Sequence, residues 1–334
     1  MGNKKLLPFF SMILLVAFNL HAEEKKWGGE KADVRFRIVC LQQGEDHRAN
    51  GNPGIDKNIS ALMELAREGA KTNPDVIVFP EYATTGWPYP VPEVIRGTGE
   101  SIPGNGKLYS MYRELAKELT IPVIGWLVEK EENRYYNTAF LLDENGNYKG
   151  KYRKVHTNLR EQNIWGFTPG DSFQIWEIDS CKIGMSICAD MWFPETVMCN
   201  SLLGADIIIH QSVGDDMGWV IPTRARDHFI PIVTSILEQG TWGVDQWGGI
   251  IRKGSRFHEY NVFDVYPFRQ VITKRLGGWY PKMGRRAYRN PKAYNVLTDT
   301  STVPPLTKVF CDPETGKTRS KEELSKKFPR YTGK

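Results

Sequence analysis

The stretch CKIGMSICAD, residues 181–190, carries most of the fold information, because an apolar strand pattern runs directly into a cysteine. The predicted strand ends at Cys188, just before a turn and a short helix that begins near Pro194. A cysteine in this position points its thiol into a cleft, where a neighbouring base or cation can activate it. The backbone N–H of Ala189 would face the same cavity and complete an oxyanion hole. The alternative is a buried cysteine that behaves as a small apolar side chain.

A second segment places a carboxylate at the end of another strand. FPEYATTGW, residues 79–87, puts Glu81 directly after the apolar run at 75–79. Enzymes with α/β folds build their sites at the carboxyl ends of strands. Partial burial there would raise the pKa of Glu81 and make it a usable general base. The other interpretation is a carboxylate that caps the following turn.

A third segment, KGKYRKVH at residues 149–156, contains Lys154. A lysine held in place can donate to a developing oxyanion as a fixed cation. The alternative for this segment is a solvated basic strand.

Hydrophobic periodicity predicts alternating strands and helices around these segments. A hairpin is expected around Asp143-Glu144-Asn145-Gly146, with strands at 135–142 and 148–154. The pattern favours an α/β layered fold with a mixed sheet, and one domain over 30–312. Further strands are expected at 34–41, 75–79, 121–127, 173–178, 181–188 and 205–211, and helices at 56–70, 108–119 and within 222–239.

Taken together, the three segments resemble the Glu, Lys and Cys motifs of the nitrilase superfamily of carbon–nitrogen hydrolases, in its amidase- and carbamoylase-like branch. The resemblance covers residues 34–240 and implies a four-layer α-β-β-α sandwich that forms homodimers or higher homo-oligomers. It implies catalysis without a cofactor, with Cys188 as nucleophile, Glu81 as general base, and Lys154 and Ala189 as oxyanion donors. Glu161 matches the second glutamate of the family; its alternative is a surface loop carboxylate.

The sequence departs from this family after residue 240. The usual Gly-x-Ser strand pattern is missing, and residues 240–249 are rich in glycine and tryptophan instead. The last strands of the sheet, and the pocket wall that they support, are therefore left open.

The resemblance also bears on the substrate. Ala189-Asp190 stands where true nitrilases have Trp-Glu, which favours an amide, and Trp192 stands where acid-binding relatives have arginine. We therefore expect an uncharged amide as substrate. The alternatives are that Arg160 or Arg224 binds a carboxylate and that Trp192 serves core packing. The side chains expected to form an aromatic wall are Tyr82, Trp87, Trp165 and Trp192. The open alternatives are a nitrilase acting on a nitrile and a non-catalytic exported binding protein on the same fold.

Residues 1–22 have the order of a signal peptide: Lys4 and Lys5, a mostly apolar stretch from 6 to 20, and the small residue Ala22. We expect a secreted or periplasmic protein without a stable membrane span after cleavage; a retained anchor is the alternative. Cleavage removes two lysines from a net charge of +5 and leaves +3, which is too little for a nucleic-acid binder. The charged tail at 313–334 should lie on the surface.

Five cysteines without a CxxC pair and six scattered histidines predict no metal site. The odd cysteine count leaves at least one thiol unpaired in an exported protein.

Overall fold

The computed structural model describes residues 34–45, 54–86, 92–179, 181–214 and 218–267. The predicted signal peptide at 1–22 and charged tail at 313–334 lie outside the described residues. Within the described residues no helix is long and apolar enough to cross a membrane.

Helices and strands alternate along the chain, as the periodicity predicts. They are β1 (Phe36–Gln42), α2 (Ile55–Ala70), β2 (Val76–Val78), α3 (Pro92–Thr98), α4 (Lys107–Leu119), β3 (Val123–Glu131), β4 (Arg134–Leu142), β5 (Tyr148–Arg153), α5 (Leu159–Asn163), β6 (Ile175–Ile178), β7 (Cys181–Ile187), η2 (Cys188–Trp192), α6 (Pro194–Leu203), β8 (Ile207–Ser212), α7 (Val220–His228), β9 (Ile232–Ile236), β10 (Trp242–Val244), β11 (Ile250–Lys253) and β12 (Glu259–Val265).

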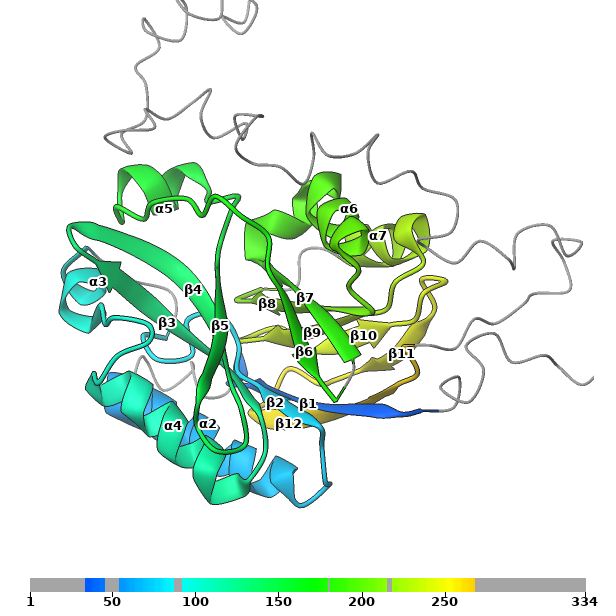
Figure 1. Cartoon of the computed structure of the whole chain (residues 1–334), viewed down its shortest axis with the longest axis horizontal. Helices are drawn as coiled ribbons and strands as arrows, with labels where there is room; N and C mark the ends of the chain where they lie inside the picture. Colours follow the sequence, from blue (N-terminus) through cyan, green and yellow to red (C-terminus); the bar gives the residue numbers. More distant parts are fainter. Residues whose placement is uncertain (1–33, 46–53, 87–91, 180, 215–217, 268–334) are drawn as a thin grey trace, which may run out of the picture.

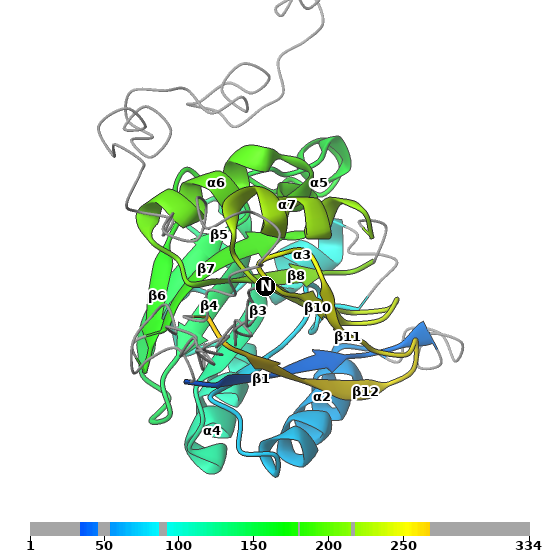
Figure 2. The ribbon, with the colours of Figure 1, turned by 90° about the vertical axis from the view of Figure 1, so that its right-hand side faces the viewer.

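The strands form two six-stranded mixed sheets, in the orders β12-β1-β2-β3-β4-β5 and β11-β10-β9-β8-β7-β6. In each sheet three adjacent strands are parallel: β1, β2 and β3 in the first, and β7, β8 and β9 in the second. Antiparallel strands complete both sheets on either side. The two sheets share one hydrophobic core and pack on each other (Figures 1 and 2).

Both faces of the central strands are buried, and β1 shows why its sequence is almost continuously apolar. Ile38 and Cys40 belong to the core between the two sheets, whereas Val39 and Leu41 pack with the helices on the outer face. Side chains alternate across a strand, so a run of apolar residues serves two cores at once.

Helices cover the outer face of each sheet. The apolar faces of α2 and α4 pack on the first sheet, and residues of α6 and α7 pack on the second. Figure 1 shows α2 and α4 on one side of the sheets and α6 and α7 on the other. The predicted four-layer α-β-β-α sandwich is thus confirmed.

The helical stretch predicted within residues 222–239 is confirmed as α7. Only the first part of 222–239 is helical: α7 ends at His228, and Ile232–Ile236 is the buried strand β9. Pro231 stands just before this strand, and a proline disfavours helix in the residue that precedes it. The segment after residue 240, which the sequence left open, supplies strands β10 to β12.

Candidate active site

The three motif residues follow the ends of three strands and meet at one cavity. Glu81 follows β2, Lys154 follows β5, and Cys188 follows β7. Glu81 and Cys188 line a cavity of ≈ 300 Å³, and Lys154 contacts Glu81 directly. The described residues that line it are Glu81, Tyr82, Asn158, Glu161, Trp165, Cys188, Ser212, Val213, Gly214, Glu238 and Gln239.

A buried lysine bridges two buried carboxylates beside this cavity. Lys154 Nζ lies 3.0 Å from Glu81 Oε1 and 2.7 Å from Glu161 Oε1. All three side chains are at most 1% exposed. A buried charge needs a partner, and here one cation is shared by two anions. Glu161 is therefore not a surface loop carboxylate.

Asn137, in the middle of β4, fixes the positions of the two carboxylates relative to each other. Its Nδ2 donates to Glu81 Oε1 at 2.7 Å and to Glu161 Oε1 at 3.0 Å. Its Oδ1 accepts from Trp126 Nε1 at 2.6 Å, which fixes the orientation of the amide. Lys154 and Asn137 thus supply donors to the same two oxygen atoms.

Glu81 has one engaged oxygen and one oxygen with open acceptor capacity. Oε1 accepts from Lys154 and Asn137, whereas the buried Oε2 has no hydrogen-bond partner among the described residues. Burial raises the pKa of Glu81 above its usual range, and the charge of Glu161 adds to this, although Lys154 and Asn137 oppose it. Such a carboxylate can accept a proton at Oε2 without losing its position.

The environment of Cys188 favours the protonated thiol. Burial raises the pKa of Cys188 well above its usual range, and the Glu81 carboxylate adds to the effect more than Lys154 opposes it. Burial lowers the pKa of Lys154, but the interactions with Cys188, Glu161 and Glu81 outweigh it and raise that pKa well above its usual range. The site therefore holds a neutral thiol, a fixed ammonium and a base.

The backbone is strained at two positions of the site. Tyr82 has φ 58° and Cys188 has φ 46°, in the left-handed region that non-glycine residues seldom adopt. Such strain is kept at functional sites when the surroundings fix the conformation. At Cys188 it turns the chain sharply from β7 into η2, whose first turn holds Ala189.

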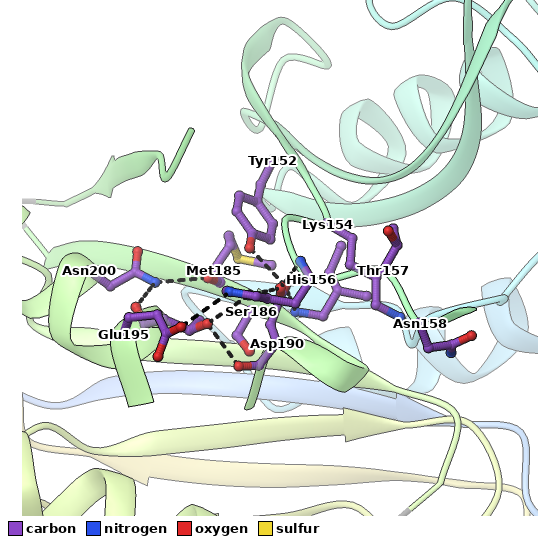
Figure 3. A network of polar contacts seen from close by, with 12 residues as sticks. Tyr152, Lys154, His156, Thr157, Asn158, Met185, Ser186, Asp190, Glu195 and Asn200 are labelled. Carbon is purple, nitrogen blue, oxygen red and sulfur yellow. Dashed lines mark hydrogen bonds and ion pairs between the residues drawn. The ribbon is translucent and has the colours of Figure 1, made fainter. Parts of the chain in front are cut away.

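Asp190 ties the cysteine turn to the lysine segment (Figure 3). Its Oδ2 accepts from Ile187 N at 2.9 Å and from Tyr152 OH at 2.8 Å. Its Oδ1 accepts from His156 N at 2.7 Å and lies 2.9 Å from His156 Nδ1. Because Ile187 precedes Cys188 and His156 follows Lys154 by two residues, one carboxylate fixes both backbones.

His156 continues this network. Its ring stacks on Phe193 with centroids 4.2 Å apart, and its Nε2 lies 3.8 Å from Glu195 Oε1. Burial raises the pKa of Asp190, but the hydrogen bonds from His156 and Ile187 outweigh it and lower that pKa. Asp190 is therefore a charged structural acceptor at neutral pH.

The carbon–nitrogen hydrolase family matches residues 41–236, which is more than half of the chain. The chain belongs to this family, within the nitrilase superfamily. A protein named nitrilase from Pyrococcus abyssi is 31% identical over 190 residues, covering 55% of this chain and 71% of that protein. The omega-amidase NIT2 of Mus musculus is 27% identical over 225 residues, covering 59% of this chain and 78% of that protein.

A solved structure of Saccharomyces cerevisiae Nit3, described as a member of branch 10 of the nitrilase superfamily, has the same fold. Its TM-score is 0.61 at 19% identity, covering 71% of this chain and 92% of that chain.

The aromatic side chains predicted to contact substrate in this carbon–nitrogen hydrolase divide into two groups. Tyr82 and Trp165 line the cavity, with ring centroids 6.1 Å apart, and Tyr82 donates to Glu161. Trp192 does not line it: this residue is 40% exposed and contacts Trp219. Trp87 lies outside the described residues.

The two arginines considered as carboxylate ligands, Arg160 and Arg224, also lie apart from the cavity lining. Arg160 is exposed on α5, and Arg224 donates to the backbone oxygen of Trp192. The lining of the cavity therefore contains neither arginine.

Several residues of the site escaped the sequence analysis: Trp126, Asn137, His156 and Glu238. The signal for Asn137 was a polar residue inside an otherwise apolar strand, which is costly to bury without partners. Among the described residues, no group of three or more histidine, cysteine, aspartate or glutamate side chains is arranged to hold a metal ion.

Proposed function

We propose that the protein is an amidase that cleaves a non-peptide carbon–nitrogen bond through a thioester on Cys188. The observation that carries this proposal is that three groups meet at one cavity: the neutral thiol of Cys188, the Glu81 carboxylate with one unpaired oxygen among the described residues, and the buried ammonium of Lys154. A nucleophile, a base and an oxyanion donor are the groups that acyl transfer requires.

The proposed reaction follows from which of these groups can give or accept a proton. Glu81 Oε2 takes the thiol proton as the sulfur of Cys188 attacks the amide carbon. Lys154 and the N–H of Ala189 stabilise the oxyanion that forms on the carbonyl oxygen. When the C–N bond breaks, protonated Glu81 returns the proton to the leaving nitrogen, which departs as ammonia or an amine. Glu81 then deprotonates a water molecule that attacks the thioester carbon, the C–S bond breaks as the carboxylic acid leaves, and Glu81 returns the proton to the sulfur of Cys188.

Glu161 and Asn137 serve to hold the reacting groups in this scheme. Glu161 shares Lys154 with Glu81, so the ammonium stays centred between two anions instead of pairing tightly with the base alone. Asn137 keeps Glu81 Oε1 occupied, which leaves Oε2 for the thiol proton.

An amide is favoured over a nitrile by Ala189-Asp190, and the cavity argues against a carboxylate on the substrate. Within the part of the chain that the structure describes, its lining contains Glu81, Glu161 and Glu238 but no lysine, arginine or histidine. The acidic lining, and not Trp192, is therefore the reason to expect that acidic amides bind poorly, because burying an anion without a cationic partner is costly.

The test is ammonia release from an amide and its matching nitrile by the purified protein and by Cys188→Ala. We expect the amide to be hydrolysed and the variant to lose activity by several orders of magnitude while it remains folded. Hydrolysis of the nitrile alone would make the protein a nitrilase. An intact protein that hydrolyses neither, and whose Cys188 is alkylated by iodoacetamide no faster than a free thiol, would support a binding role.

We also propose that the mature protein is exported and forms homo-oligomers. The pattern at residues 1–22 supports export, and exposed apolar side chains around α5 and α7 support association: Leu159 is 65% exposed, Ile164 59% and Trp219 70%. N-terminal sequencing of protein from the periplasm or medium should begin near Glu23, and light scattering should give at least a dimer mass. An intact Met1 in a cytoplasmic fraction, or a monomer mass, would contradict the respective proposal.

A further inference from the structure

The cavity contains a third carboxylate that the reaction does not use. Glu238 lines it and is only 4% exposed. Its backbone N–H donates to Val213 O at 3.0 Å, which extends the pairing of β9 with β8 by two residues. A carboxylate is seldom buried without a role for its charge, since its removal from water is costly.

Strand order places Glu238 two strands away from the cysteine in the same sheet. Cys188 follows β7, and Glu238 follows β9, with β8 between them in the same parallel sheet. Neighbouring strands are about 4.8 Å apart, so the two backbones are separated by roughly 10 Å across the sheet. A substrate whose carbonyl carbon meets Cys188 can therefore reach Glu238 with a chain of a few carbon atoms.

The remaining walls suit a cation. Tyr82 and Trp165 present aromatic rings to the same cavity, and aromatic faces attract ammonium and guanidinium groups. Lys154, which lies beside the cavity, is shared by Glu81 and Glu161. Among the described residues that line the cavity, none is a lysine, arginine or histidine.

We propose that the preferred substrates are amides that carry an ammonium or guanidinium group a few carbon atoms from the reacting carbonyl, and that Glu238 determines this specificity. The inference rests on the proposed amidase function and names its substrate class. A carboxylate has four lone-pair positions, so Glu238 can accept from a substrate cation in addition to its contacts within the protein.

The test compares three primary amides of matched length: δ-aminovaleramide, hexanamide and the monoamide of adipic acid. For the native protein we expect kcat/KM to be about 10- to 100-fold higher for the ammonium compound than for hexanamide, the range typical of hydrogen bonds between charged groups. The acidic monoamide should be the poorest substrate. Glu238→Gln should bring the ratio of ammonium to neutral compound to within about threefold of unity. Glu144→Gln, in the exposed hairpin turn, should keep the native ratio.

The outcomes separate the two proposals. Hydrolysis of hexanamide and δ-aminovaleramide with equal kcat/KM would overturn the role of Glu238 and leave the amidase function standing. A ratio that survives Glu238→Gln in a folded variant would also overturn it. Hydrolysis of none of the three amides would count against the amidase function itself.

A binding measurement keeps the inference testable if the variant fails to fold or no amide is hydrolysed. In the native protein, pentylammonium should slow alkylation of Cys188 by iodoacetamide at concentrations where pentanol and pentanoate do not. Equal protection by all three, or none by pentylammonium, would refute the cation site.

Discussion

Replacing Asp190 by asparagine tests whether one carboxylate fixes the geometry of the site. Asparagine keeps the shape but turns one acceptor oxygen into an NH₂ donor. With the remaining oxygen facing His156, the new NH₂ group faces Tyr152 OH and Ile187 N. The tyrosine hydroxyl can rotate and accept, whereas the Ile187 N–H meets another donor and loses its partner.

The cost follows from these contacts. An orphaned buried N–H costs about 2 kcal/mol, and the loss of charge from the bonds to His156 costs about 1 kcal/mol more. We expect Asp190→Asn to lower the free energy of unfolding by about 3 kcal/mol. Because Ile187 precedes Cys188, the turn that presents the thiol should shift, and a displacement of about 1 Å lowers kcat by about 100-fold.

Urea unfolding of the full chain and steady-state kinetics measure the two effects. Asp171→Asn is the matched control, since Asp171 is exposed and bonds only its neighbour Ser172 among the contacts described. Two results together would refute this reasoning for a folded Asp190→Asn variant. Its free energy of unfolding would lie within about 0.5 kcal/mol of the parent, a difference typical of surface substitutions, and its kcat would lie within about twofold of the parent.

Three further predictions concern the residues around the cavity. Glu81→Gln and Lys154→Ala should each lower kcat by about 10²- to 10³-fold in stopped assays of ammonia release; an effect on KM alone would contradict the roles given to them. The raised pKa of Glu81 means that the base is protonated as pH falls, so the acidic limb of kcat/KM should lie above pH 4.5, the ordinary value, and Glu81→Gln should abolish the limb. Asn137→Asp places a third carboxylate against Glu81 and Glu161, which should move that limb to higher pH, whereas Asn137→Ser should shift it less.

The motif residues could be predicted because local sequence determines their setting. Glu81 and Cys188 each follow a short apolar strand, and a strand end fixes which edge of the sheet a residue occupies. Lys154 follows a hairpin whose turn is explicit in Asp143-Glu144-Asn145-Gly146. The four-layer sandwich came from the resemblance of these segments to a family, since periodicity alone indicates only an α/β layered fold.

The other parts of the site depend on contacts between distant segments. In the sequence Asn137 looks like an ordinary strand residue. Its role depends on the fold, which brings Glu81 and Glu161 to its amide group. Glu238 was missed because the only element predicted within 222–239 was a helical stretch, so no strand end was expected there. Trp192 was expected in the pocket because relatives have an arginine at this position. The direction of its side chain, at the end of a short 3₁₀ helix, depends on the surrounding fold and cannot be predicted from the local sequence.

Two buried carboxylates show how environment separates structural from chemical roles in this molecule. Asp190 accepts from Ile187, Tyr152 and His156, and its pKa is lowered, so it stays charged and holds the backbone. Because the pKa is lowered, the stability contributed by Asp190 is present above pH 3.8, the ordinary value for the unfolded chain, and is lost as pH falls through the lower folded pKa. Glu81 is equally buried, but among the described residues one of its oxygens lacks a partner and its pKa is raised, so it accepts a proton more readily than Asp190 does. The number of donors that reach each carboxylate therefore decides which one can act as a base.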